Sequence, residues 1–250
     1  ILEIGSDKVA AYIAEPVLAS GGCIVPPKNY IKRFWDVCKK YDVLYISDEV
    51  VTGFGRMGHF FSSEEVFDIV PDIITCAKGI TSGYMPLGAV LFSDKLLNDI
   101  KKESALFFHG YTYSGHPACC AAALKNIEII KRDKILEHVR EIEPYFHNKL
   151  NNLYELPIVG DVRGKGLMAG IECVINKDSK EALILDKAIG SRIDEESIKL
   201  GLIIRPLYHI CVLSPALIIT KSQIDELVEK LYSAINNSLE QLKEEGLWKN

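Results

Sequence analysis

The sequence predicts an α/β protein with a mostly parallel sheet, and three observations indicate this. Short apolar runs rich in β-branched residues alternate with longer amphipathic stretches through the first half of the 250 residues. The runs 43–47 (VLYIS) and 73–77 (IITCA) barely alternate in polarity, as strands do when helices cover both faces of a sheet. With 48% hydrophobic and 25% charged residues, the chain can bury one large core or two modest ones.

The first half is expected to form the parallel sheet and its helices. The first strand is expected at 9–14 (VAAYIA). Pro26 and Pro27 then open a helix through Lys40, in which apolar residues recur at three- and four-residue spacing. Three more strands are predicted, two of them central, followed by a short helix: 43–47, 73–77, 87–92 and the helix 94–102.

The second half is richer in helices and predicts a smaller α+β domain. We place the boundary near Arg132, which divides the chain into residues 1–132 and residues 133–250. Two strands are predicted between residues 158 and 172, on either side of a turn at Gly164 and Gly166. The other predicted elements are helices at 118–131, 134–153, 182–199 and 221–242, and strands at 202–205 and 211–214.

Composition argues against several partners. Lys and Arg total 29 against 34 Asp and Glu, so the basic surface of a nucleic-acid binder is not expected. The longest uncharged runs, 79–93 and 207–220, are shorter than the ~20 residues of a membrane helix. Seven cysteines without a CxxC spacing favour reduced thiols and argue against a metal site. We therefore expect a cytoplasmic protein that binds neither nucleic acid, membrane nor metal.

One acid and one amine follow the two central strands. Asp48 stands directly after VLYIS and Lys78 directly after IITCA, and ligands of open α/β sheets bind at the carboxyl ends of strands. Asp48 could instead be a turn cap, and Lys78 could extend to solvent. Together the two side chains suit pyridoxal phosphate, because a lysine can form a Schiff base with its aldehyde while an aspartate keeps its ring nitrogen protonated.

Longer motifs surround both residues. The segments are YISDEVVTGFGRMG (45–58), PDIITCAKGITSGYMPLGAV (71–90), YTYSGHP (111–117), IAEPVLASGGCIVPP (13–27), GDVRGKGLMAGIE (160–172) and GLIIRPLYHICVLSPALIIT (201–220). Together they resemble the class III (omega) aminotransferases, in that family's order and over essentially the whole chain. Within the family, AKGITSGYMPLGAV and YTYSGHP are most similar to the branch that uses pyruvate and accepts amines or omega-amino acids.

The resemblance implies a fold and an assembly. It implies a fold type I transferase, with residues 1–132 as the C-terminal part of the cofactor-binding large domain and residues 133–250 as the small domain. It also implies a homodimer with shared active sites. The family's N-terminal half, with its phosphate-binding turn, is not in this chain, so we expect the C-terminal portion of a longer enzyme.

The resemblance also implies roles for individual residues. Lys78 matches the Schiff-base lysine and Asp48 the partner of the pyridine nitrogen. Val50 matches the residue packed on the ring face, and Thr112 the hydroxyl that reaches the cofactor phosphate of the neighbouring subunit. Two further matches are Glu15, behind the residues that touch the cofactor, and Arg205, which binds a substrate carboxylate.

The predicted activity is transfer of an amino group from an amine or omega-amino acid to a keto acid such as pyruvate. Two alternatives stay open: a decarboxylase or aminomutase of the same fold, and a catalytically inert fragment that only self-associates. His116 precedes Pro117 at a helix start, so we interpret it as structural rather than as an acid or base. His209 and Cys211 depart from the family's usual sequence after the arginine. We therefore expect the substrate pocket near Arg205 to differ from that of other family members.

Overall fold

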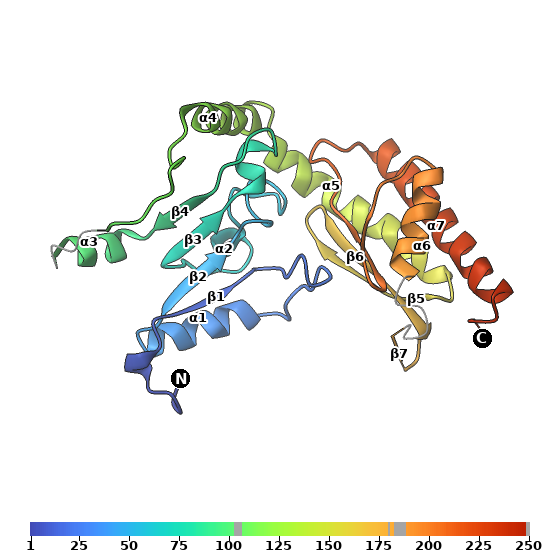
Figure 1. Cartoon of the computed structure of the whole chain (residues 1–250), viewed down its shortest axis with the longest axis horizontal. Coiled ribbons are helices and arrows are strands. Elements are labelled where there is room, and N and C mark those ends of the chain that lie inside the picture. The colour runs from blue at the N-terminus through green and yellow to red at the C-terminus, as the bar shows by residue number, and fades with distance from the viewer. Residues whose placement is uncertain (103–106, 180, 183–188, 249–250) are drawn as a thin grey trace. The chain divides into compact units, whose positions relative to one another are not determined.

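The computed structural model describes residues 1–102, 107–179, 181–182 and 189–248. The chain forms two compact units (Figure 1). The first comprises Ile1–Val17 and Pro26–Glu137, and the second comprises Leu18–Val25 and His138–Asn250. The assignment of residues 1–132 and 133–250 as the large and small domains of an enzyme stays a prediction.

The first unit is built on a four-stranded sheet in the order β1-β2-β3-β4 (Figure 1). β1 (Ala11–Ala14), β2 (Leu44–Asp48) and β3 (Ile73–Cys76) run parallel, and β4 (Ala89–Phe92) is antiparallel to β3. The register pairs Ala14 with Ser47 and Asp48 with Thr75. The carboxyl ends of three neighbouring strands therefore share one edge of the sheet.

Helix α1 (Tyr30–Lys40) packs on one face of this sheet. The ring of Phe34 stacks on Tyr12 of β1 at 4.8 Å between centroids, and Tyr45 of β2 is buried beside them. Burial consequently alternates along β2, and Ile13 of β1 is 58% exposed. We expected continuous burial because the run VLYIS is apolar throughout, but hydrophobicity does not tell which face this chain's own helices cover.

The start of α1 differs from the prediction. We expected Pro26 and Pro27 to open the helix, but it begins at Tyr30. Asn29 has a φ of 64°, which lies in the left-handed region and cannot continue a right-handed helix. The prolines therefore belong to the connection from the preceding segment rather than to the helix.

The remaining helices of the first unit are α2 (Ser62–Glu65), α3 (Asp94–Lys102) and α4 (Pro117–Arg132). α3 and α4 lie where the apolar spacing predicted them. A short 3₁₀ helix spans Lys78–Thr81, directly after β3. α4 packs on this turn, with Ala123 and Ile130 buried against Phe54 and Ile80.

The second unit contains an antiparallel sheet in the order β5-β6-β9-β8, with β7 paired to β6. Its strands are β5 (Val159–Lys165), β6 (Met168–Asn176), β7 (Glu181–Ala182), β8 (Arg205–Leu207) and β9 (Ile210–Leu213). Its helices are α5 (Ile135–Leu150, from His138 onward), α6 (Ile189–Lys199) and α7 (Lys221–Glu244).

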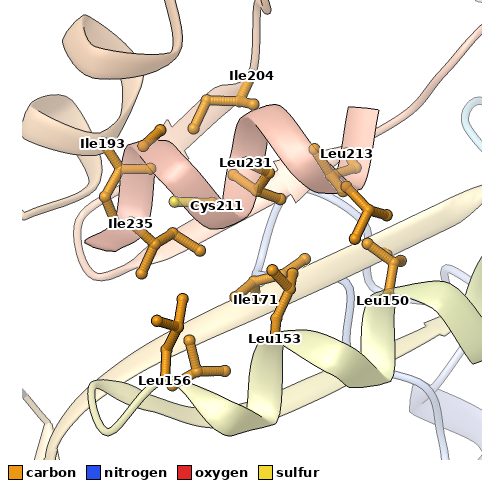
Figure 2. Packing of buried hydrophobic residues seen from close by; sticks show 14 of the residues in the cluster. Leu150, Leu153, Leu156, Ile171, Ile193, Ile204, Cys211, Leu213, Leu231 and Ile235 are labelled. Carbon is orange, nitrogen blue, oxygen red and sulfur yellow. The ribbon is translucent and has the colours of Figure 1, made fainter. Parts of the chain in front are cut away.

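The core of the second unit lies between this sheet and its helices. Figure 2 shows Leu150 from α5, Ile193 from α6 and Ile235 from α7 directed toward Ile171 and Cys211 of the sheet. All five side chains have no exposed surface. Burying an aliphatic side chain of this size contributes about 1.5–3 kcal/mol, so this cluster is a main source of the unit's stability.

Some boundaries in the second half differ from the sequence-based ones. β8 begins at Arg205 rather than at residue 202, and α5 ends at Leu150, where a 3₁₀ helix (Asn151–Glu155) follows. Of the helix expected at 182–199, residues 189–199 are helical, but Ala182 belongs to strand β7, and residues 183–188 lie outside the described part of the chain. The glycine turn lies between two strands as predicted, with Gly166 at a φ of 59°.

We predict that Asp72→Ala weakens the first unit. The carboxylate of Asp72 is buried, accepts a hydrogen bond from the backbone N–H of Tyr45 at 2.9 Å and pairs with Lys39 Nζ at 2.7 Å. Its loss leaves a buried N–H without an acceptor, which should lower the free energy of unfolding by about 1–3 kcal/mol. Chemical denaturation measures this change. Asp36→Ala, at an exposed pair with Lys32, is the control, and an equal effect of both substitutions would contradict the prediction.

Candidate active site

Three polar residues lie at the shared carboxyl edge of β1, β2 and β3. Glu15 follows β1, Asp48 is the last residue of β2, and Lys78 comes two residues after β3 ends. The parallel register that pairs Asp48 with Thr75 brings them to the same end of the sheet. The structure thus gathers an amine and two carboxylates where open α/β sheets bind ligands.

Asp48 is half-buried and holds the turn that follows it. Its Oδ1 accepts a hydrogen bond from the backbone N–H of Val50 at 3.1 Å. This is the turn-cap contact that the sequence left open. It uses one carboxylate oxygen and places the partly buried Val50 in the same turn, so the capping role and a ligand-binding role are compatible.

Lys78 begins a turn that is fixed by its neighbours. Its φ is 37°, in the left-handed region, and its side chain is exposed. A Cβ on the next residue, Gly79, would lie 2.9 Å from Cβ of Phe54 and 3.2 Å from the carbonyl oxygen of Gly53. The absence of a side chain at Gly79 therefore lets the turn after β2 pack directly beside Lys78.

Asn126 of α4 ties the same turn to the helix. Its amide nitrogen donates to the carbonyl oxygens of Gly79 at 2.9 Å and Ile80 at 3.1 Å. Its Oδ1 accepts from the hydroxyl of Ser82 at 2.7 Å. Sequence reasoning missed Asn126, because it is one of several polar residues in the second half of α4 and nothing in the pattern distinguishes it.

Glu49, between Asp48 and Val50, was also missed. Its side chain has no exposed surface. Its two oxygens accept five hydrogen bonds from the turn after β2 and from the start of α2. The donors are the hydroxyl of Thr52 and both the backbone N–H and the hydroxyl of Ser62 and Ser63. Alternation along β2 indicated that Glu49 points away from Asp48, yet no sequence pattern predicted such a set of donors.

Burial also shifts two titrating groups near this edge. It lowers the pKa of the Arg56 guanidinium to about 10, and Arg56 stays charged at neutral pH. Burial raises the pKa of the Cys76 thiol on β3, and the negative charge of Glu49 adds to this effect. Cys76 is therefore a thiol rather than a thiolate nucleophile at neutral pH.

Thr112 lies in an exposed loop before α4. The hydroxyl of Ser114 accepts a hydrogen bond from the N–H of Tyr111 at 2.8 Å and shapes this loop. Among the described residues, no hydrogen bond joins Thr112 to Asp48 or Lys78. His116 precedes the first residue of α4, and its carbonyl accepts from the N–H of Cys120 at 3.0 Å.

Arg205 is the first residue of β8, in the second unit, and its side chain is exposed. The antiparallel register pairs it with Val212, Val212 with Gly170, and Gly170 with Arg163. Paired residues of neighbouring strands point to the same face, so Arg205 and Arg163 lie on one face of this sheet.

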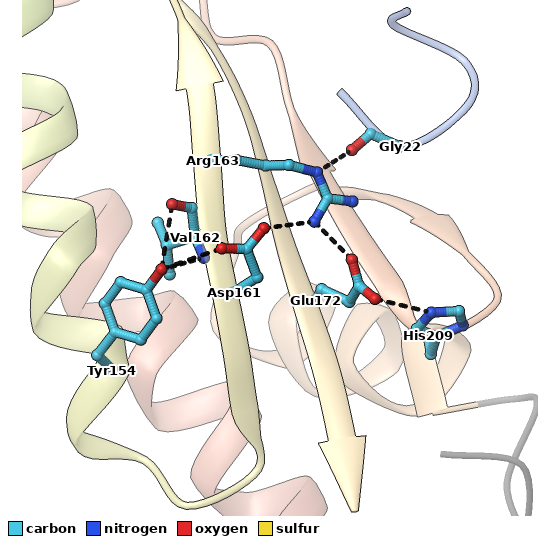
Figure 3. Close-up of polar contacts among 7 residues, drawn as sticks. All are labelled: Gly22, Tyr154, Asp161, Val162, Arg163, Glu172 and His209. Atoms are coloured by element: carbon cyan, nitrogen blue, oxygen red, sulfur yellow. Dashed lines mark hydrogen bonds and ion pairs between the residues drawn. The ribbon is translucent and has the colours of Figure 1, made fainter. Parts of the chain in front are cut away.

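Figure 3 shows a polar network on that face. Arg163 donates to Asp161 at 2.8 Å, to Glu172 at 2.5 Å and to the carbonyl oxygen of Gly22 at 3.0 Å. His209 Nε2 lies 3.4 Å from Glu172. His209, one of the two residues near Arg205 that differ from the family's usual sequence, therefore belongs to this network. The other departure, Cys211, is buried in the core, where burial raises the pKa of its thiol well above the usual range.

The described residues contain no helix that is long and apolar enough to cross a membrane. In the same part of the chain, no group of three or more His, Cys, Asp or Glu residues is arranged to hold a metal ion. All seven cysteines are free, and six of them are buried.

Comparison with known proteins identifies the family of this chain. The sequence matches the aminotransferase class-III family over residues 1–235. The chain therefore belongs to this family, whose members use pyridoxal 5'-phosphate.

Two relatives illustrate the match. The chain is 43% identical to the putrescine–pyruvate aminotransferase of Pseudomonas aeruginosa over 229 residues, which are 91% of this chain and 50% of that protein. It is 41% identical over 247 residues to a probable gamma-aminobutyrate transaminase 3, mitochondrial, of Oryza sativa subsp. indica, covering 98% of this chain and 48% of that protein. The chain thus spans about half the length of the curated relatives it matches.

Known structures agree in fold. A transaminase from the marine bacterium Virgibacillus superposes with a TM-score of 0.92 at 42% identity, over 97% of this chain and 56% of that one. An (S)-enantioselective omega-transaminase from Thermomicrobium roseum gives 0.91 at 40% identity, over 96% of this chain and 53% of that one. The expected α/β fold of the type I transferases is therefore confirmed.

We predict that Asn126→Ala loosens the turn at Lys78. The substitution removes three hydrogen bonds, two of which satisfy carbonyl oxygens of the turn itself. The amides of Ser82 and Gly83, which donate within this turn, should exchange hydrogen faster, and the free energy of unfolding should fall by about 1–3 kcal/mol. Lys125→Ala, at an exposed neighbour on α4, is the control. Unchanged exchange of both amides in Asn126→Ala would contradict the prediction.

Proposed function

We propose that the protein containing this chain is a transaminase that moves an amino group from an amine or omega-amino acid to a keto acid such as pyruvate. The observation that carries the proposal is the position of Asp48 and Lys78 at the ends of two adjacent parallel strands. Relatives named for putrescine with pyruvate and for gamma-aminobutyrate support this class of substrates.

The residues at this edge suit pyridoxal phosphate. The exposed amine of Lys78 is accessible to an aldehyde, and the carboxylate of Asp48 is a partner for a cationic ring nitrogen. The apolar side chain of Val50 stands in the turn after Asp48, where it would contact a ring face. When bound, the cofactor supplies an aldehyde for the amino group and a ring that accepts electrons.

Each residue then has a task in the proposed reaction. Lys78 would hold the cofactor covalently through its ε-amine, and the free amine of the same side chain would carry the proton between the substrate carbon and the cofactor carbon. Asp48 keeps the ring nitrogen protonated through its negative charge. Glu15, at the end of β1, would support this edge from the neighbouring strand.

Arg205 is proposed to bind the carboxylate of the keto acid. A guanidinium presents its donors in a planar fork that matches a carboxylate. The exposure of its side chain, on the face where Arg163 already neutralises Asp161 and Glu172, leaves Arg205 available for an incoming anion.

We propose that two copies assemble into a homodimer in which Thr112 binds the cofactor phosphate of the partner subunit. Support comes from the apolar surface around Thr112, where Phe108, Tyr111 and Tyr113 are each at least 80% exposed. Exposed aromatic clusters of this kind mark interaction sites. The free cysteines support a reducing compartment such as the cytoplasm.

We predict that Lys78→Ala abolishes transamination in the whole protein, because no other residue can both attach the cofactor and move the proton. The fold should be retained, since the side chain is exposed. The measurement is a steady-state assay with an amine donor and pyruvate. Dependence of the rate on pyruvate indicates transamination, whereas release of carbon dioxide indicates decarboxylation. Lys95→Ala, an exposed lysine on α3, is the control. Substantial residual transfer in Lys78→Ala would rule out the assignment.

We predict that Arg205→Ala discriminates between substrates. Half-reactions with pyruvate or alanine should lose roughly 2 to 5 kcal/mol of transition-state stabilisation, the value of a charge pair buried on binding. Half-reactions with amines that lack a carboxylate should be nearly unchanged. Single-turnover kinetics measure both, with Arg132→Ala as the control. Equal losses for the two substrate classes would assign Arg205 a structural role instead.

A further inference from the structure

Glu49 stands out because a fully buried carboxylate is costly unless its charge is satisfied. Its Oε2 accepts from Thr52 Oγ1 at 2.7 Å, from Ser62 N at 3.0 Å and from Ser62 Oγ at 2.8 Å. Its Oε1 accepts from Ser63 N at 2.8 Å and from Ser63 Oγ at 2.5 Å. The carboxylate thereby holds the start of α2 against the end of β2.

Only a carboxylate can satisfy this arrangement. Each of its two oxygens faces one backbone N–H, that of Ser62 or that of Ser63. A hydroxyl can turn to become an acceptor, but a backbone N–H cannot. In either orientation, the NH₂ group of a glutamine at this position would therefore oppose a backbone donor.

The backbone of Glu49 connects this cluster to both sides of the proposed cofactor site. Its N–H donates to the carbonyl oxygen of Thr75 on β3 at 2.8 Å, and its own carbonyl accepts from Gly53 at 3.0 Å. A Cβ on Gly53 would lie 2.8 Å from that carbonyl oxygen, so the turn is tight. Gly53 and Phe54 in turn pack on Gly79, the neighbour of Lys78.

We propose that Glu49 is a positioning residue of the cofactor site: its buried carboxylate fixes the turn that presents Asp48 and Val50, and sets this turn against the one that carries Lys78. The proposal rests on the proposed function, because it concerns the placement of groups that hold pyridoxal phosphate. Glu49 itself touches no reacting atom. It acts through the residues on either side of it.

The test compares the whole protein with its Glu49→Gln variant. Pyridoxal phosphate is titrated into each cofactor-free protein, and binding is followed by absorbance. We expect the dissociation constant to rise at least about tenfold, which corresponds to about 1.4 kcal/mol. We also expect the pH at which the absorbance of the bound cofactor changes to shift, because Asp48 no longer faces the ring nitrogen in its original geometry.

A second measurement needs no cofactor. Hydrogen exchange of the Val50 and Gly53 amides, which donate to Asp48 and Glu49, should be faster in Glu49→Gln. Should that variant not fold, Ser62→Ala removes one hydroxyl donor, keeps the backbone N–H, and should show the same changes with smaller size.

Glu196→Gln is the matched control. Glu196 is only 8% exposed and accepts from Lys199, Asn237 and Gln241 in the second unit. Its substitution should lower stability and leave cofactor affinity and the pH of the absorbance change as they were. Parent-like affinity and parent-like exchange of Val50 in the Glu49 and Ser62 variants would overturn the proposal. A parent protein that binds no pyridoxal phosphate would instead refute the proposed function.

Discussion

Parallel pairing of β1, β2 and β3 is the constraint on which the rest of the candidate site depends. Because the three strands run in the same direction, whatever follows each of them lies at one edge. Asp48 and Lys78 are far apart in sequence, and only this pairing brings an acid and an amine to the same place. A register shift of one residue would turn Asp48 toward the opposite face, so the hydrogen bonds that fix the register also fix the geometry of the candidate site.

Side chains of buried and partly buried polar residues add further hydrogen bonds to those of the strand pairing. Asp72 joins β2 to the segment before β3, Glu49 joins the end of β2 to α2, and Asn126 joins the turn at Lys78 to α4. Each such group costs free energy unless all its partners are present. Apolar packing alone tolerates small shifts, whereas a carboxylate with five donors has one arrangement. Glu49 and Asn126 thus fix the turns that follow β2 and β3, while Asp72 fixes the opposite end of the same two strands.

The sequence predicted the four strands of the first sheet, β5, β6 and β9 of the second, and the helices at 94–102, 118–131 and 221–242, because these depend on local periodicity. It missed β7, where it placed the start of a helix, and its strand at 202–205 shares only Arg205 with β8. It could not predict that α1 starts at Tyr30, since the left-handed conformation of Asn29 depends on its packing. Glu49 and Asn126 were missed for a related reason: their donors and acceptors come from segments distant in sequence. Asp48 and Lys78 could be proposed because strand ends and longer motifs point to them, and their roles, like those of Val50, Thr112, Glu15 and Arg205, stay predictions.

In the second unit, hydrogen-bonded polar groups likewise fix the surroundings of Arg205, the proposed substrate-binding arginine. Gly170 has no side chain, and a Cβ there would lie 2.7 Å from the carbonyl oxygen of Gly22, so the segment Leu18–Val25 can lie directly on the sheet. Arg163 donates to that carbonyl while its charge is neutralised by Asp161 and Glu172. Arg163 therefore holds this loop, because it donates hydrogen bonds to Asp161, Glu172 and the carbonyl oxygen of Gly22. Arg205, in the same row of the sheet, is exposed, and it is the arginine that we propose to bind the substrate carboxylate.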